Sequence, residues 1–175
     1  SDLLINESDP VAVRGPLATR YVQQFLRNVA WGDVDFLILD LPPGTGDIQL
    51  TIVQTAELDG VVVVTTPQEV ALIDARKAIG LFERVETPIL GIIENMSYFQ
   101  CPSDGKIYHI FGEGGGEREA ARLGVPLLGK IPLDISTRSG GDEGRPVALE
   151  EPGQNPVSAA FRQVAEQCAR VVLDR

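Results

Sequence analysis

The most chemically suggestive stretch of the sequence runs from Val34 to Asp47 and reads V-D-F-L-I-L-D-L-P-P-G-T-G-D. Asp40 follows a short apolar run, and the turn from Gly44 to Gly46 follows two prolines. A carboxylate at the end of a buried strand can hold Mg²⁺ through water, and the amides of a glycine-rich turn can face a phosphate. The pattern therefore predicts either a phosphate-binding corner or a structural corner in which Asp47 caps the next helix.

A second candidate group is the run C-P-S-D that begins at Cys101. A thiolate can serve as a metal ligand. Asp104 and the single histidine, His109, could add an oxygen or a nitrogen ligand, although turn and packing roles are commoner for such residues. Cys168 falls on the apolar face of a predicted helix and is expected to be a buried small hydrophobe. Two cysteines do not make a disulfide framework.

The elements that must position these residues can be predicted from hydrophobic patterning. Short apolar runs bounded by glycine or proline predict strands over 36–41, 61–65, 89–94 and 127–131. Apolar residues at helical spacing predict helices over 17–30, 48–57, 70–85, 117–123 and 156–173. The segments 96–116 and 139–153 are predicted to be a loop and a surface excursion. Alternating strands and helices favour an α/β fold, with a mostly parallel sheet and helices on both faces.

Four residues fall at or just after the ends of the predicted strands: Asp40, Thr66, Asn95 and Pro132. Ligands of open parallel sheets bind beyond the carboxyl ends of the strands. Each of the four residues on its own can be explained as a capping or turn residue. Together they predict one binding edge of the sheet.

Composition limits the possible classes of function. The chain has 175 residues, 43% of them hydrophobic, and a mean hydropathy of +0.04, which is typical of a soluble globular domain with a sizeable core. Its formal net charge of -10 opposes binding to nucleic acid or to an anionic membrane, so neither is expected as a partner. No apolar stretch approaches transmembrane length, and the N-terminus has no signal-peptide pattern. A cytoplasmic, reducing location is therefore expected.

Several motifs occur in the order found in one protein family. They are R-G-P at Arg14, D-L-P-P-G-T-G-D at Asp40, T-P-Q with A-L-I-D-A-R-K from Thr66 onward, E-N-M-S at Glu94 and I-F-G at Ile110. Together they closely resemble the Mrp/ApbC type of P-loop ATPase, the iron–sulfur cluster carriers related to MinD. The resemblance extends over most of the chain.

The resemblance implies a P-loop NTPase fold of the SIMIBI/MinD-like class, with ATP and Mg²⁺ as cofactors. The residues that it implies for nucleotide binding are Asp40, Gly44, Thr45, Gly46, Asn95 and Pro132. In this comparison Asp40 would hold Mg²⁺ through water, the glycines of the turn would face the γ-phosphate, Asn95 would read the adenine edge, and Pro132 would flank the base.

The resemblance also implies a homodimer that carries a [4Fe–4S] cluster and delivers it to apo iron–sulfur proteins. In the family, a C-P-x-C pair supplies two thiolates per subunit, and four thiolates suit a bridging cluster. Cys101 matches the first cysteine of that pair, but Asp104 stands at the second position. A dimer of this chain would offer two thiolates, which is poor ligation for such a cluster.

The other departure from the family concerns the phosphate loop. No G-x-x-x-x-G-K-[ST] motif occurs in the 175 residues. Residues 1–175 are therefore expected to be a single partial P-loop NTPase domain, the C-terminal portion of an ATPase without its N-terminal part. Phosphoryl transfer depends on the lysine and the metal that such a loop holds, so this chain alone is expected to be inactive.

Two other functions fit the same pattern. One is a non-catalytic scaffold or binding protein that kept the α/β frame and lost both the phosphate loop and the cluster pair. The other is a MinD/ParA-like positioning ATPase, which is weakened because the sequence has no terminal basic amphipathic helix of the kind that binds membranes. A phosphate loop in the coding sequence upstream would separate the first alternative from a carrier ATPase.

Overall fold

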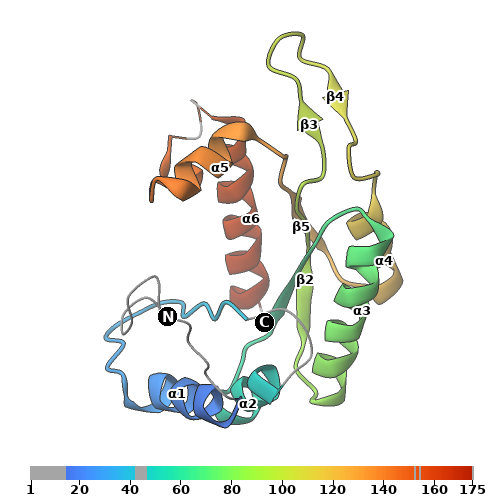
Figure 1. Cartoon of the computed structure of the whole chain (residues 1–175). Coiled ribbons are helices and arrows are strands. Elements are labelled where there is room, and N and C mark those ends of the chain that lie inside the picture. The colour runs from blue at the N-terminus through green and yellow to red at the C-terminus, as the bar shows by residue number, and fades with distance from the viewer. Residues whose placement is uncertain (1–14, 42–46, 152, 154, 175) are drawn as a thin grey trace. The chain divides into compact units, whose positions relative to one another are not determined.

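The computed structural model describes residues 15–41, 47–151, 153 and 155–174. The chain divides into two compact units, Ser1–Leu58 and Asp59–Arg175, each with its own internal contacts (Figure 1). The organisation of residues 1–175 as a single domain stays a prediction. Among the described residues, no helix is long and apolar enough to cross a membrane.

The first unit contains two helices that contact each other, α1 (Gly15–Asn28) and α2 (Asp47–Thr55). Both helices were predicted, to within two residues at each end. Proline in the first turn suits α1, because its missing N–H would have no partner within the helix. Ile52 of α2 is buried, whereas Phe25 of α1 is exposed.

The predicted strand at 36–41 is wrong for the structure as described. These residues are irregular, and the side chains of Phe36, Leu37 and Ile38 are exposed. A strand exists only where its N–H and C=O groups form a ladder with a neighbour. No described strand pairs with this segment, so its strand-forming composition has no ladder to join.

The second unit is built on three parallel strands, β1 (Val61–Thr65), β2 (Ile89–Glu94) and β5 (Leu127–Lys130), in the order β1-β2-β5. All three strands were predicted. Thr65 pairs with Glu94, and Glu94 pairs with Lys130. The carboxyl ends of the three strands are therefore level with one another.

Helices cover both faces of this sheet, as predicted (Figure 1). On one face, α3 (Glu69–Arg84) and α4 (Gly115–Leu123) contribute to a core with side chains of the strands: Val63, Ala75, Ile79, Ile92 and Ala120. On the other face, α6 (Pro156–Leu173) contributes to a second core: Ile93, Leu128, Ile131, Val147, Val157 and Val164. Adjacent strand residues alternate between the two cores, which is why continuous apolar runs identified the strands.

Two segments predicted to be irregular contain regular structure. The loop 96–116 holds an antiparallel hairpin of β3 (Phe99–Gln100) and β4 (Ile107–Tyr108), which projects beyond the carboxyl end of the sheet (Figure 1). Helix α5 (Ile135–Asp142) overlaps the start of the predicted surface excursion, 139–153, which also contains a 3₁₀ turn, Val147–Leu149. Helix α5 forms because the Asp134 side chain accepts a hydrogen bond from the Thr137 N–H at 3.0 Å and so caps the first turn.

Candidate functional site

Backbone hydrogen bonds join the carboxyl ends of all three parallel strands. The Asn95 N–H donates to the Thr65 carbonyl at 2.7 Å, and the Ile131 N–H donates to the Glu94 carbonyl at 2.9 Å. The Ser97 N–H then donates to the Ile131 carbonyl at 3.0 Å. Three of the predicted site residues, Thr66, Asn95 and Pro132, thus lie on adjacent chain segments. We call these segments, 65–66, 94–97 and 130–133, the rim.

Asn95 occupies a tight turn that directly follows β2. Its side-chain oxygen accepts a hydrogen bond from the Met96 N–H at 3.0 Å. Met96 itself adopts φ of 52°, a left-handed conformation that is uncommon for residues other than glycine. Such conformations are held in place only by surrounding structure and gather at functional sites. The turn keeps the Asn95 amide at the rim, partly exposed.

Thr66 adds a polar group to the rim. The sequence pattern predicts its position at the end of a strand but no specific role for its hydroxyl. Its hydroxyl oxygen is buried and makes no hydrogen bond within the described part of the chain. Most buried hydroxyls have a protein or water partner, and an exception requires an explanation. A ligand or water at the rim would supply that partner.

An ion-pair network joins α3 and α4 through the buried carboxylate of Glu119. The Glu119 carboxylate is 3% exposed and accepts hydrogen bonds from Arg76 at 2.9 Å and from Arg122 at 2.7 Å. Burial alone would raise the pKa of Glu119, but the two guanidinium partners outweigh it and lower the pKa below its ordinary value. The carboxylate therefore stays ionised and ties the two helices together.

The Cys101 hairpin, residues 99–108, starts and ends next to the rim. Its turn is closed by hydrogen bonds from the Cys101 N–H to the Lys106 carbonyl and from the Gly105 N–H to the Cys101 carbonyl, both 2.8 Å. The Cys101 sulfur lies 3.1 Å from the Ser103 hydroxyl. Asp104 accepts from the Lys106 N–H at 3.1 Å and pairs with the Lys106 ammonium at 3.3 Å. The turn is therefore ordered and presents a thiol at its tip.

The hairpin turn makes the Cys101 thiol more acidic than an ordinary cysteine. Hydrogen bonding to Ser103 is the main reason why the pKa of Cys101 is lowered. The pKa of Asp104 is also lowered, first by the Lys106 N–H and then by Cys101. By contrast, burial raises the pKa of Cys168 on α6. A thiolate is the form that binds metals, so Cys101 is the better ligand of the two.

Within the described residues, no three histidine, cysteine, aspartate or glutamate side chains converge on one position for a metal ion. His109 lies near Glu113, with the Nε2 and Oε1 atoms 3.6 Å apart, rather than beside Cys101. One described chain thus brings only Cys101 and Asp104 together as ligands of the hairpin tip.

The remaining predicted site residues belong to the first unit. Asp40 belongs to the first unit, where it is exposed. Gly44, Thr45 and Gly46 lie outside the described residues. Their expected roles with Mg²⁺ and the γ-phosphate stay predictions.

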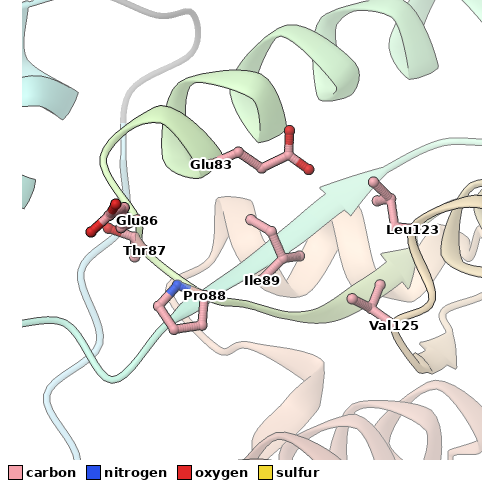
Figure 2. Close-up of a pocket in the computed structure, with 7 residues that line it drawn as sticks. All are labelled: Glu83, Glu86, Thr87, Pro88, Ile89, Leu123 and Val125. Carbon is pink, nitrogen blue, oxygen red and sulfur yellow. The ribbon is translucent and has the colours of Figure 1, made fainter.

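A hollow of about 300 Å³ lies at the opposite, amino-terminal edge of the sheet (Figure 2). It is lined by two carboxylates and by mainly apolar side chains: Glu83, Glu86, Thr87, Pro88, Ile89, Leu123 and Val125. Figure 2 shows Glu83 extending from the end of α3, with Ile89 at the start of β2 facing the same hollow. Two carboxylates and no lining cation make this hollow unsuited to a phosphate.

The residue that sequence reasoning missed is Glu94. The motif E-N-M-S was used for its asparagine, yet Glu94 is fully buried and bonded to Ser97 and Gly116. Its position directly after the apolar run of β2 was the available signal. An acid that continues a buried strand must find hydrogen-bond donors in the interior.

Comparison with known protein families shows to which family this chain belongs. The family model described as the NUBPL iron-transfer P-loop NTPase matches residues 1–169. The chain belongs to this family. An iron–sulfur cluster carrier protein of Pyrococcus horikoshii is 48% identical over 165 residues, which is 94% of this chain and 55% of that protein. The mitochondrial iron–sulfur protein required for NADH dehydrogenase of Arabidopsis thaliana is 45% identical over 168 residues, 96% of this chain and 53% of that protein.

Solved structures share the fold of this NUBPL-family chain. A nucleotide-binding protein from Archaeoglobus fulgidus, in complex with ADP, has a TM-score of 0.67 and 43% identity over 74% of this chain and 53% of that one. The cell division ATPase MinD of Pyrococcus furiosus has a TM-score of 0.65 over 87% of this chain and 59% of that one. At 24% identity, MinD shows the shared α/β fold alone. The chain spans about half the length of the curated relatives that it matches.

Proposed function

We propose that this chain is part of an iron–sulfur cluster carrier ATPase, in which the rim binds the adenine end of ATP and the Cys101 hairpin contacts the cargo cluster through one thiolate per chain, so that the chain alone retains the cluster only weakly. The observation that carries this proposal is the convergence of the partly exposed Asn95 and the unpaired Thr66 hydroxyl at the carboxyl end of a parallel sheet. This end is where such sheets bind their ligands. Family membership and the ADP complex of the Archaeoglobus fulgidus relative support the same reading.

The adenine base would be recognised by its edge and by its face. An asparagine side chain can pair with both the exocyclic amine and a ring nitrogen of adenine, whereas guanine offers two acceptors at the same positions. Asn95 supplies such an amide, Thr66 supplies a hydroxyl, and the segment after Ile131 supplies an apolar wall that includes the buried Pro132. The proposed preference is therefore adenine over guanine.

The phosphates and Mg²⁺ would be bound through the first unit. Mg²⁺ commonly keeps several waters and takes one or two carboxylates from the protein. The exposed Asp40 carboxylate fits contact through water. Gly44, Thr45 and Gly46 are proposed to face the γ-phosphate, as the family resemblance implies.

The cluster would be held between two copies of the chain. Each chain contributes the acidic Cys101 thiol, with Asp104 beside it. Two copies then offer two thiolates and two carboxylates, which differs from the four thiolates that suit a [4Fe–4S] cluster. Apo iron–sulfur proteins are the clients that this function requires, and a reducing compartment such as the cytoplasm suits an exposed thiolate.

An NMR titration of the ¹⁵N-labelled chain with ADP, and separately with GDP, tests the base site. We expect ADP to move the amide resonances of Thr66, Asn95 and Leu133, and GDP to move them less. Asn95→Ala should abolish the difference between the nucleotides. Gln163→Ala removes an exposed amide on α6 and should leave the difference intact. Equal responses to ADP and GDP, or responses confined to other residues, would contradict the proposal.

A further inference from the structure

Glu94 is the last residue of β2, and none of its surface is exposed. One carboxylate oxygen accepts a hydrogen bond from the Ser97 hydroxyl at 2.5 Å, and the other accepts from the Gly116 N–H at 2.6 Å. Ser97 lies just before β3, and Gly116 lies in the first turn of α4, after β4. A single carboxylate therefore binds both ends of the segment that contains the Cys101 hairpin.

The environment explains why a buried carboxylate is tolerated at this point. A buried charge costs free energy unless hydrogen bonds satisfy it. One donor is a first-turn N–H of α4, where the helix dipole favours a negative charge. Among the described residues no direct ion pair includes Glu94, although it interacts electrostatically with Lys130, so the two hydrogen bonds are the close contacts that hold the carboxylate.

Close packing leaves the start of α4 little room to move independently of the strands. A Cβ atom at Gly116 would lie 3.0 Å from the Cβ of Glu94. A Cβ atom at Gly115 would lie 2.5 Å from the Pro67 carbonyl oxygen. The C-terminal end of the hairpin segment, at Gly115 and Gly116, thus packs closely against the ends of both β1 and β2. This packing fixes the geometry of its hydrogen bond to Glu94.

The main chain of Glu94 is part of the rim, so the residue that holds the hairpin segment is also bonded to the neighbouring rim segments. Its carbonyl accepts from the Ile131 N–H, and the next residue, Asn95, donates to the Thr65 carbonyl. A ligand that shifts the Asn95 turn must therefore shift Glu94 or strain its hydrogen bonds. Through Ser97 and Gly116, that displacement reaches both ends of the hairpin segment.

We propose that Glu94 is a positioning residue that couples the Asn95 turn to the orientation of the Cys101 hairpin, an inference that rests on the function proposed above. In this arrangement the occupancy of the rim by an adenine nucleotide changes how the Cys101 thiol is presented. A carrier that must hold its cargo in one nucleotide state and release it in another needs such a connection.

The test is NMR on the full 175-residue chain, with ADP as the probe. In the wild-type chain, ADP should move the amide resonances of Thr66 and Asn95 and also those of Cys101 and Gly105 at the hairpin tip. Without ADP, the hairpin amides should have order parameters in the rigid range, about 0.85.

Glu94→Ala should lower the order parameters of the hairpin amides to below about 0.6. In this variant ADP should still move Thr66 but no longer move Cys101. Glu94→Gln should rescue both properties, because its carbonyl can accept from Gly116 while its amide donates to the Ser97 hydroxyl. Glu119→Gln, a change at another buried glutamate that does not touch the hairpin segment, should leave both properties as in the wild type.

If Glu94→Ala does not fold, Ser97→Ala provides the second variant. It removes the hydrogen bond that the Ser97 hydroxyl donates to Glu94 and should speed hydrogen exchange at the backbone N–H of residue 97 about tenfold, since local opening no longer has to break that bond. The response of Cys101 to ADP should shrink in parallel. An unchanged Cys101 response in Ser97→Ala would overturn the coupling.

The outcomes separate this inference from the proposed function. If ADP moves Thr66 and Asn95 but not Cys101 in the wild type, the coupling is overturned and the nucleotide site stands. If ADP moves no resonance, the nucleotide site fails, and the order parameters decide whether Glu94 positions the hairpin. Unchanged hairpin order in Glu94→Ala, or an equal loss of order in Glu119→Gln, would overturn the positioning role.

Discussion

The carboxylate of Glu94 accepts a hydrogen bond from the Gly116 N–H at 2.6 Å, although 22 residues separate the two along the chain. This contact fastens the start of α4 to the end of β2. It also encloses the Cys101 hairpin between two fixed points, Ser97 and Gly116. The rim and the hairpin are therefore parts of one connected structure within the second unit.

Gly116→Ala should destabilise the protein because its Cβ would lie 3.0 Å from the Cβ of Glu94 and 3.2 Å from a carboxylate oxygen. Overpacking of this kind costs about 1–3 kcal/mol. Urea unfolding measures the change. Gly80→Ala is the matched control, because its Cβ would meet nothing within 4 Å and alanine favours the helix by up to about 1 kcal/mol. Equal effects of the two substitutions would contradict the close contact.

Glu119→Gln should lower the free energy of unfolding at pH 7 by on the order of 1–2 kcal/mol. It replaces the buried carboxylate that pairs with two partly exposed arginines by a neutral amide. The pKa of Glu119 is lowered in the folded state, so this stabilisation is present above its ordinary pKa of 4.5 and is lost as the pH falls through the folded value. The difference from wild type should therefore shrink in urea unfolding at pH 3.

The control for the network is Glu69→Gln, which removes the exposed partner of Arg76. Exposed ion pairs contribute about 0–1 kcal/mol, so little change is expected at either pH. A Glu119→Gln difference that is the same at pH 7 and pH 3 would show that the lowered pKa contributes nothing to stability.

The two thiols should differ in reactivity. Cys101 has a lowered pKa, chiefly through Ser103, whereas burial raises the pKa of Cys168. At pH 7 a disulfide reagent should modify Cys101 first, because the thiolate is the reactive form. Ser103→Ala should slow this phase and Cys168→Ser should preserve it. A fast phase that persists in Cys101→Ser would show that the reactive thiol is not Cys101.

Much of the fold follows from local sequence, because burial on both faces leaves continuous apolar runs. The strands β1, β2 and β5 and the long helices carry such patterns and appear where they were predicted. Residues 36–41 carry the same pattern but form no strand, since a strand also requires a neighbour with which to pair. Helix α5 was missed because its apolar residues do not define a buried face, and the Asp134 cap specifies it instead.

The site was predictable only where its residues follow strand ends. Asn95, Thr66 and Pro132 were identified by that rule, and the register of the sheet brings their segments together. The role of Glu94 depends on the approach of Gly116 from a distant helix. No local pattern encodes that approach, although the small residues at the start of α4 permit it.

The isolated 175-residue chain should hydrolyse ATP no faster than a buffer blank. Its sequence contains no phosphate-loop lysine, and phosphoryl transfer depends on positioning and charge neutralisation of the phosphates. Phosphate release from ATP in the presence of Mg²⁺ is the measurement. Turnover that Asp40→Ala abolishes would show that this chain forms an active site by itself.

Anaerobic reconstitution with iron and sulfide tests most directly whether Cys101 is the cluster ligand and whether the number of thiolates at the hairpin tips limits cluster retention. The unmodified chain should retain little brown chromophore after desalting, because a dimer offers one Cys101 thiolate per chain. Asp104→Cys should increase the retained iron and sulfide, since it doubles the thiolates at the hairpin tips, and Cys101→Ala in that background should remove the gain. A full [4Fe–4S] complement on the unmodified chain that survives both desalting and Cys101→Ala would contradict the assignment and locate the ligands elsewhere.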